Sequence, residues 1–249
     1  MAYLRFSVRL FFLVIWLIIG LLIVSLSFPW LKKNTREMIV RYWSYYLMKM
    51  TGVHIQQEGK PILDAPVMLV ANHVSWIDIF IINSQRATSF IAKAEIRQWP
   101  VIGWLVGAVG TIFIQRGSKS DVVTINASMK AHFDQNTCIG LFPEGTTSDG
   151  LSILHMYSGL LEGAMNARVP IQPVALLFYY QQQRSGRVAF IGEQTLLANM
   201  WVLLSSKNVG VTVRFLPPVT KAGEEVLITR QELIEQIREI LLKEVSVER

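Results

Sequence analysis

The sequence Val70-Ala71-Asn72-His73-Val74-Ser75-Trp76-Ile77-Asp78 joins an apolar run to a polar turn and a helical pattern. The run 67–71 has the length and composition of a buried strand. A histidine five residues ahead of an aspartate can act as a general base that the carboxylate orients. On one continuous helix, residues five apart lie about 140° apart and cannot meet. We therefore predict that His73 lies in the turn and Asp78 in the first turns of the following helix.

On both sides of this stretch, short apolar runs alternate with turns and helical patterns. The predicted strands are 53–57, 67–71, 88–92, 111–115, 137–142, 171–178, 187–191 and 209–215. The predicted helices in this part of the chain are 76–84, 121–133, 159–167 and 229–245. Several strands are apolar throughout, which is typical of a sheet covered on both faces. The sequence therefore predicts an α/β fold with a mixed, largely buried sheet flanked by helices, the last helix lying on the sheet.

The N-terminal segment has the composition of a membrane helix. Residues 10–28 carry no charge, and their length is close to the roughly 20 apolar residues that span a bilayer. Basic residues flank this segment on both sides: Arg5, Arg9, Lys32, Lys33 and Arg36. No clear cleavage site follows, so we predict a retained helix that either spans the bilayer or dips into it.

Residues 37–50 mix aromatic and basic side chains on a helical pattern. This pattern fits an interfacial helix, and it also fits an ordinary amphipathic helix packed on a domain. We predict that residues 1–50 form an N-terminal membrane anchor, a hydrophobic helix plus an interfacial helix. Residues 51–249 are predicted to form one further domain.

Composition narrows the class of partner. The chain is 51% hydrophobic, its formal net charge is +6, and its mean hydropathy is +0.36. A basic protein can bind nucleic acid, anionic lipid or a phosphorylated ligand, but this apolar content favours lipid. The Lys and Arg residues are scattered or flank the apolar segment instead of forming one stripe, so no nucleic-acid partner is expected.

Metal and disulfide chemistry find little support in the sequence. Cys138 is the only cysteine, and its apolar surroundings predict a buried, inert thiol. The other histidines, His54, His132 and His155, show no paired ligand spacing and are predicted to be structural. We therefore expect no metal site.

Other polar residues follow the predicted strands. Glu144, Gly145 and Thr146 follow the strand 137–142 and offer a carboxylate, a flexible backbone and a hydroxyl to a ligand, although a merely solvated turn fits them as well. Lys93 and Arg116 follow two further strands and can supply positive charge for a phosphate, or they can simply lie on the surface. Pro170 precedes another strand, where it can shape a pocket wall.

Five motifs occur in the order found in the 1-acyl-sn-glycerol-3-phosphate acyltransferase (lysophospholipid acyltransferase) family, which this chain resembles over roughly residues 50–220. They are Asn72-His73-x4-Asp78, Lys93-x-Glu95, Phe113-Ile114-x-Arg116, Phe142-Pro143-Glu144-Gly145-Thr146 and Val169-Pro170-Ile171-x-Pro173. The resemblance implies that residues 51–249 are an acyltransferase domain that takes an acyl group from acyl-CoA or acyl carrier protein and gives it to a lysolipid acceptor. An enzyme of this kind needs no further cofactor and works at a membrane, in our expectation at the cytoplasmic face of the inner (cell) membrane.

The resemblance also implies roles for individual residues. His73 would accept the proton of the attacking hydroxyl, and Asp78 would orient and stabilise the imidazolium. The acceptor hydroxyl attacks the thioester itself, which agrees with the lack of a Gly-x-Ser-x-Gly nucleophile elbow. The implied substrate-binding residues are Asn72, Lys93, Arg116, Glu144, Gly145, Thr146 and Pro170.

One position departs from the family pattern and bears on the acceptor. The third motif of the family usually continues Glu-Gly-Thr-Arg, and here Thr147 takes the Arg position. If that Arg grips the phosphate of the acceptor, its loss weakens the case for 1-acyl-glycerol-3-phosphate, which remains our first expectation. The run Glu-Gly-Thr-Thr-Ser-Asp-Gly resembles the lyso-ornithine lipid acyltransferase branch. A non-catalytic lipid-binding membrane protein on the same scaffold is the alternative of another class.

Overall fold

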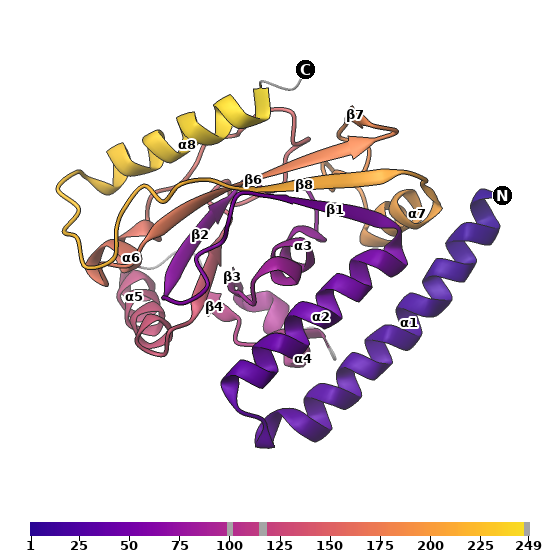
Figure 1. Ribbon diagram of the computed structural model, residues 1–249, viewed down its shortest axis with the longest axis horizontal. Coiled ribbons are helices and arrows are strands. Elements are labelled where there is room, and N and C mark those ends of the chain that lie inside the picture. Colours follow the sequence, from indigo (N-terminus) through magenta and orange to yellow (C-terminus); the bar gives the residue numbers. More distant parts are fainter. Residues whose placement is uncertain (99–101, 115–118, 247–249) are drawn as a thin grey trace.

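The computed structural model describes residues 1–98, 102–114 and 119–246, which form one sheet with helices packed on both faces (Figure 1). The α-helices are α1 (Ala2–Ser27), α2 (Lys33–Thr51), α3 (Asp78–Gln85), α4 (Ile102–Ala108), α5 (Lys119–Asp134), α6 (Leu161–Asn166), α7 (Leu196–Ser205) and α8 (Arg230–Ser246). Short 3-10 helices are η1 (Phe28–Trp30) and η2 (Ala94–Gln98). The strands are β1 (Val53–Glu58), β2 (Val67–Ala71), β3 (Ser89–Lys93), β4 (Ile112–Ile114), β5 (Cys138–Leu141), β6 (Ile171–Tyr180), β7 (Gln183–Arg184) and β8 (Val209–Phe215).

The sheet has the strand order β1-β8-β6-β2-β5-β3-β4, and β7 pairs with β6. The strands β6, β2, β5, β3 and β4 run parallel to one another. The pair β1 and β8 runs the opposite way, because β8 is antiparallel to β6 and parallel to β1. The predicted mixed sheet is confirmed.

The central strand β2 shows why the sheet is buried on both faces. Its side chains alternate between two hydrophobic cores, as the period of a strand requires. Leu69 belongs to the core that includes residues of α2, α3 and α7, and Val70 belongs to the core that includes residues of α5, α6 and α8. All five residues of β2 are buried, so this strand can carry no polar side chain until it ends at Ala71.

Two sequence predictions need correction. Residues 187–191 were expected to be a strand but have no regular secondary structure. Val188 and Ala189 are buried there, so the apolar run reflects burial instead of strand pairing. The helix α7 follows at Leu196–Ser205, where no element was predicted. The final helix packs its apolar side on the sheet as expected, with Leu233, Ile234, Ile237 and Leu241 buried.

The N-terminal segment forms two antiparallel helices, α1 and α2, that lie against the domain (Figure 1). The apolar α1 is long enough to cross a membrane, and most of it is not buried within the protein. Trp16 and Trp43 join the two helices, because each indole Nε1 donates to the carbonyl of the other residue, at 3.0 and 3.2 Å. The inner side of α2 is buried through Leu47 and Met48. Its outer side exposes aromatic and apolar residues, Met38, Tyr42, Tyr45 and Tyr46.

Candidate active site

His73 and Asp78 meet at the carboxyl end of β2. The strand stops at Ala71, and α3 begins at Asp78, so the residues between them form a tight loop. The Nδ1 atom of His73 lies 2.7 Å from Oδ2 of Asp78. Asp78 is fully buried, whereas 21% of the His73 side chain is exposed. The turn and the helix start therefore bring the two residues together as the sequence predicts.

The Asp78 carboxylate also organises the loop backbone. Its Oδ2 atom accepts hydrogen bonds from the backbone N–H groups of Val74 at 2.7 Å and Ser75 at 2.9 Å. The position at the first turn of α3 adds the favourable field of the helix N-terminus for a negative charge. An ionised carboxylate can only accept, so when Asp78 is ionised a neutral His73 ring carries its proton on Nδ1 and presents its lone pair at Nε2.

The ring of His73 is stacked on an aromatic pair. Its centroid lies 4.2 Å from that of Phe142, with the two planes 15° apart. Phe142 stacks in turn on Phe90, at 5.4 Å and 4°. These flat contacts fix the plane of the imidazole, and an aromatic face favours a positive charge placed over it. The stack is therefore suited to a histidine that becomes protonated during a reaction.

The turn after β5 holds the backbone of His73 from both sides. Oε1 of Glu144 accepts from His73 N–H at 2.8 Å, and the N–H of Ser148 donates to the His73 carbonyl at 2.8 Å. The hydroxyl of Ser148 reaches the same carbonyl at 3.2 Å. Ser148 is a neighbour of His73 that the sequence did not single out, because no local pattern links it to a residue 75 positions earlier.

Glu144 is buried and bridges two loops. Its second oxygen, Oε2, accepts from Leu154 N–H at 2.9 Å. Burial raises the pKa of the Glu144 carboxyl, while the hydrogen bonds from the His73 and Leu154 backbone and the nearby His73 act in the opposite direction. Both carboxylate oxygens therefore accept hydrogen bonds from backbone N–H groups of the protein, which favours a positioning role for Glu144. A direct contact of Glu144 with substrate stays a prediction.

Asn72 is likewise turned inward. Its Nδ2 donates to the Leu176 carbonyl at 3.1 Å, and its Oδ1 accepts from the Leu176 N–H at 2.8 Å. The fully buried amide thus continues the pairing of β2 with β6 beyond the end of the strand. This side chain fixes the loop from behind, and its expected contact with substrate stays a prediction.

Gly145 and Thr146 form the outer part of the same turn. Gly145 has φ of 67°, a backbone conformation that glycine adopts without strain. Thr146 is exposed. The hydroxyl of Thr147, at the position where the family usually has Arg, donates to the Phe190 carbonyl. The turn therefore points Glu144 and Ser148 toward His73 and leaves Thr146 facing outward.

The remaining predicted residues lie in different places. Lys93 ends β3, which is parallel to β5 and β2, so its backbone is at the same edge of the sheet as His73. Its side chain and the whole of Arg116 lie outside the described part of the chain. Pro170 precedes β6, and the register Met68↔Ile171 sets it level with Val67, near the opposite end of β2. The six residue-to-residue steps from Val67 to His73 correspond to roughly 20 Å, so this geometry gives no support to Pro170 as a wall of the pocket.

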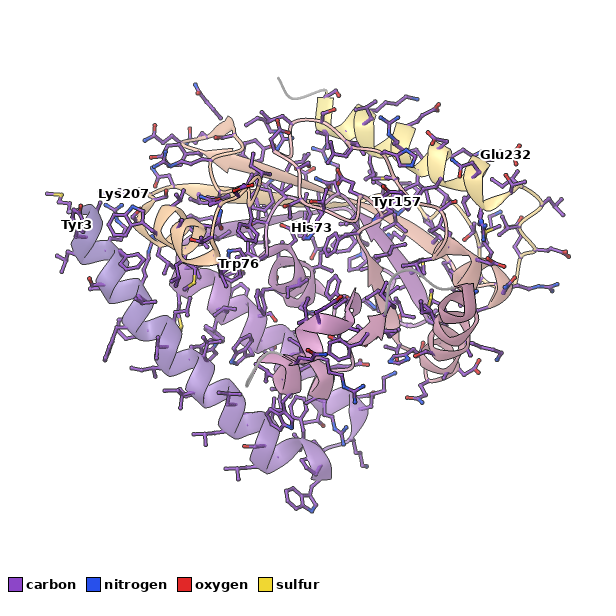
Figure 2. The ribbon with its side chains drawn as sticks, turned by 180° about the vertical axis from the view of Figure 1, so that it is seen from behind. Tyr3, His73, Trp76, Tyr157, Lys207 and Glu232 are labelled. Atoms are coloured by element: carbon purple, nitrogen blue, oxygen red, sulfur yellow. The ribbon has the colours of Figure 1, made fainter. Side chains whose placement is uncertain are left out.

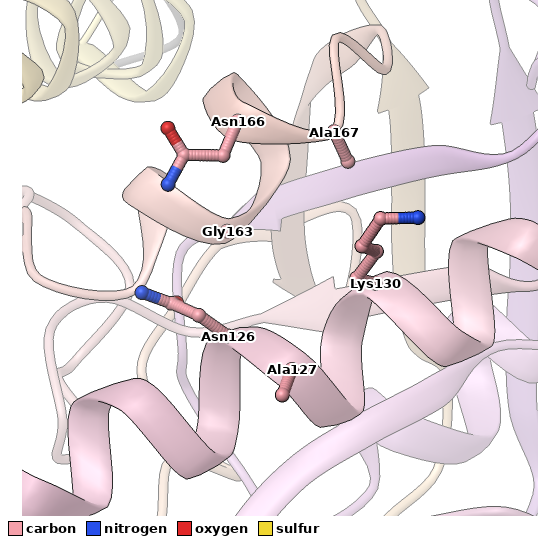
Figure 3. Close-up of a pocket in the computed structure, with 6 residues that line it drawn as sticks. All are labelled: Asn126, Ala127, Lys130, Gly163, Asn166 and Ala167. Atoms are coloured by element: carbon pink, nitrogen blue, oxygen red, sulfur yellow. The ribbon is translucent and has the colours of Figure 1, made fainter.

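A cavity of about 210 Å³ lies between α5 and α6, away from these motifs (Figure 3). The residues that line it are Asn126, Ala127, Lys130, Gly163, Asn166 and Ala167. The Oδ1 atom of Asn126 is buried there without a hydrogen-bond partner, next to the backbone of Gly163. The titratable residue in this lining, Lys130, is exposed and forms a salt bridge with Asp134 at 2.7 Å, so the cavity shows no pair like that of His73 and Asp78.

The fold and the His73 loop define a class: an α/β domain with a histidine–aspartate pair at the carboxyl edge of its sheet and an apolar N-terminal helix. The model of the Acyltransferase family matches residues 49–177, more than half of the chain, including both the His73 loop and the 142–148 turn. The chain belongs to this acyltransferase family.

Two relatives agree with this assignment, and a solved structure shares the fold. A lyso-ornithine lipid O-acyltransferase from Pseudomonas aeruginosa is 32% identical over 82% of this chain and 77% of its own length. A 1-acyl-sn-glycerol-3-phosphate acyltransferase from Neisseria gonorrhoeae is also 32% identical, over 76% of this chain and 75% of its own. The crystal structure of the 1-acyl-sn-glycerophosphate (LPA) acyltransferase PlsC from Thermotoga maritima has a TM-score of 0.68. The match covers 99% of this chain and 97% of the Thermotoga maritima chain at 18% sequence identity, so the two chains share the fold.

Proposed function

We propose that this protein is a membrane-bound O-acyltransferase that moves a fatty acyl group from an acyl thioester to the free hydroxyl of 1-acyl-glycerol-3-phosphate, giving phosphatidic acid. The donor is acyl-CoA or acyl carrier protein, and no other cofactor takes part. The observation that carries the proposal is the 2.7 Å contact between His73 Nδ1 and the buried Asp78 carboxylate. This contact leaves the partly exposed ring with a basic Nε2.

In the proposed reaction, Nε2 of His73 takes the proton of the acceptor hydroxyl while its oxygen attacks the thioester carbonyl. The C–O bond forms, the C–S bond breaks, and the imidazolium returns the proton to the leaving thiolate. General base catalysis of this kind contributes about 10²–10⁴-fold. Asp78 keeps the proton on Nδ1 and stabilises the imidazolium, and the Phe142 face stabilises the same charge.

The other residues of the site have supporting parts in the proposal. Glu144, Ser148 and Asn72 position the backbone of the His73 loop through the hydrogen bonds described above. Gly145 and Thr146 lie on the outer side of the turn, where the acceptor would approach. Lys93 and Arg116 are proposed to bind the phosphate of the acceptor, because Lys93 ends β3 and Arg116 comes soon after β4 in the sequence, and both strands belong to the parallel set.

Lyso-ornithine lipid is the second candidate acceptor. At the position where the family usually has Arg, the Thr147 hydroxyl is engaged with the Phe190 carbonyl and supplies no positive charge for a phosphate. The relative from Pseudomonas aeruginosa carries the corresponding name. Transfer to the hydroxyl of this acceptor would use the same His73 and Asp78 chemistry.

The proposed site of action is the membrane surface. We propose that residues 1–50 anchor the catalytic domain 51–249 at the cytoplasmic face of the inner membrane. The exposed apolar length of α1 supports membrane contact, and the basic flanks Arg5, Arg9, Lys32 and Lys33 support contact with anionic lipid.

The test is turnover of purified full-length protein on both acceptors, with acyl-CoA and acyl carrier protein as alternative donors. We expect product with the wild type and a loss of at least about 100-fold in His73→Ala. Thermal unfolding of the variant is measured alongside, because the substitution removes the stack on Phe142 and the hydrogen bond to Asp78, and a variant that stays folded assigns the loss to the chemistry. Turnover by His73→Ala at the wild-type rate would refute the proposed base. Lipid binding without turnover in the wild type would support the non-catalytic alternative.

A further inference from the structure

The helix α7 presents an apolar outer face that the catalytic chemistry does not use. Its ten residues include no charged side chain. Asn199 and Leu203, one turn apart, are buried against the domain. Leu197 and Trp201 are also one turn apart and point the other way, with Leu197 77% exposed. A soluble protein usually places polar residues on such an outer face, and the Leu197 end of this face instead exposes an apolar side chain.

The outer face of α7 continues into the start of α1. The Trp201 ring contacts Tyr3 at 4.9 Å and Phe6 at 4.7 Å between centroids. We call Tyr3, Phe6, Leu197 and Trp201 the α1–α7 surface. It joins α7 to the helix with the exposed apolar length that a membrane requires.

Basic groups border this surface. Arg9 donates to the carbonyls of Leu204 at 3.1 Å and Ser206 at 2.7 Å, and Arg5 donates to that of Ser205. These bonds satisfy carbonyls at the C-terminal end of α7 that have no partner within the helix. Lys207 is exposed just beyond, at the same end of the molecule as Tyr3 (Figure 2).

The inner face of α7 is bonded to the catalytic loop. Trp76, which lies between His73 and Asp78 in the sequence, donates from Nε1 to Oδ1 of Asn199 at 2.9 Å. Asn199 is fully buried, and its Nδ2 donates to the Ala189 carbonyl at 3.0 Å. The next residue, Phe190, donates its N–H to the Val74 carbonyl at 2.9 Å. A partner on the outer face of α7 would therefore be held close to the His73 loop.

We propose that the α1–α7 surface docks into the interface of the lipid bilayer and sets the His73 loop at the level of the lipid head groups. Aromatic residues at its border and basic residues around it are the side chains that prefer this depth. A second copy of the chain fits less well, because a two-fold contact through the same surface would bring Lys207 and its copy toward each other. A bilayer with anionic lipid has the complementary charge.

The test places a fluorophore on the surface of the full-length protein, reconstituted in vesicles of phosphatidylethanolamine and phosphatidylglycerol. The variant Leu197→Cys carries an environment-sensitive label, and Leu227→Cys, at a leucine 91% exposed beside α8, is the matched control. The natural Cys138 is fully buried, and burial raises the pKa of its thiol, so it does not compete for the label. We expect a blue-shifted emission and quenching by nitroxide lipids at position 197 only.

Two results would overturn the docking. One is an emission wavelength at position 197 that, on vesicle-bound protein, is the same as at position 227 and typical of a label in water. The other is a shift at 197 that occurs without vesicles and grows with protein concentration, which would indicate contact between copies. These readouts need no turnover, so the docking and the proposed acyl transfer can fail separately.

A kinetic arm links the surface to catalysis. We expect Leu197→Glu to lower turnover of vesicle-borne lysolipid by about tenfold, equal to about 1.4 kcal/mol, while turnover of a short-chain, water-soluble acceptor stays unchanged. Leu227→Glu should affect neither substrate. An equal loss on both acceptors in Leu197→Glu would indicate a folding defect and count against the surface as a lipid contact.

Discussion

The 72–78 loop and the 142–148 turn lie side by side at the carboxyl edge of the sheet, yet they use their residues differently. The loop presents a side chain, the partly exposed His73 ring, and buries the carboxylate of Asp78 behind it. The turn acts mainly through contacts with His73 itself, on its backbone from Glu144 and Ser148 and on its ring from Phe142. The comparison teaches that one segment carries the reactive groups and the other determines where they are.

The largest effect is expected where the reactive pair itself is broken. Asp78→Asn should lower turnover by about 10²–10⁴-fold, because an amide cannot stabilise the imidazolium and can favour the wrong tautomer. Turnover in lipid vesicles would be measured alongside His73→Ala and the double variant. Residues that act as a unit are not additive, so the double variant should be no worse than the poorer single one. Fully multiplicative losses would show that the two residues act separately.

The next largest effect tests the hydrogen bonds by which Glu144 holds the backbone of His73. Glu144→Gln keeps an acceptor for one of the two N–H groups of His73 and Leu154 but turns an NH₂ toward the other. The unfavourable contact should lower the free energy of unfolding by about 1–3 kcal/mol. If about 1.4 kcal/mol of this appears in the transition state, turnover falls about tenfold. Urea unfolding and steady-state kinetics measure both, and an unchanged rate with reduced stability would remove Glu144 from catalysis.

The stability difference between wild type and Glu144→Gln should depend on pH. Burial raises the pKa of Glu144 in the folded state above its ordinary value, so the folded protein binds this proton more tightly than the unfolded chain. The contribution of Glu144 to stability is therefore full at pH below the ordinary carboxyl pKa and is lost as the pH rises through the raised value. Hence the stability of wild type relative to Glu144→Gln should fall with rising pH across this window. A difference that grows with pH would contradict the assigned direction.

A smaller effect separates the aromatic stack from general packing. Phe142→Leu removes the ring under His73, and such aromatic pairs contribute about 0.5–1.5 kcal/mol, so turnover should fall about two- to tenfold. Phe90→Leu is the matched control, because Phe90 stacks on Phe142 and is one ring removed from His73. Equal losses of activity in the two variants would assign the effect to packing alone.

The smallest effect concerns the outer part of the turn. Thr147→Val removes the hydrogen bond to the Phe190 carbonyl and should cost about 0.5–1.5 kcal/mol in the free energy of unfolding. Turnover should change by less than about twofold, since the contacts to His73 remain. Thr146→Val, at an exposed position, should stay within about 0.5 kcal/mol of wild type in stability. A larger effect of Thr147→Val on turnover would show that Thr147, like Glu144 and Ser148, helps to position His73.

The sequence predicts the loop better than the turn, and the reason is the distance over which each contact forms. His73 and Asp78 are five residues apart, so a strand end and a helix start suffice to place them. Glu144 reaches His73 across 71 positions, and that contact depends on β5 lying next to β2. Adjacent strands in a parallel sheet cannot be identified from the local pattern of either one.

Burial explains the other differences. The run around Val188 and Ala189 is apolar because it is covered, and its backbone bonds to the catalytic loop instead of to a strand. Pro170 is predicted to shape a pocket wall because it precedes a strand; the register of β6 sets it level with Val67, at the other end of β2 from His73, and its role stays a prediction. The fold class could be predicted from the sequence, because continuous apolar runs such as 67–71 indicate strands buried on both faces, as in the parallel sheets of α/β proteins.

The junction of α1 with α7 has a consequence for how the chain is made. Arg5 and Arg9 leave the ribosome long before residues 204–206, whose carbonyls they meet in the folded protein. During synthesis these two guanidinium groups therefore wait in water or among lipid phosphates while almost the whole sheet is assembled. The paired indoles of Trp16 and Trp43 can close the helical hairpin much earlier. Arrival of α7 is thus a late step, which joins α1 to a helix far along the chain and adds the hydrogen bond from Trp76 to Asn199 that supports the His73 loop.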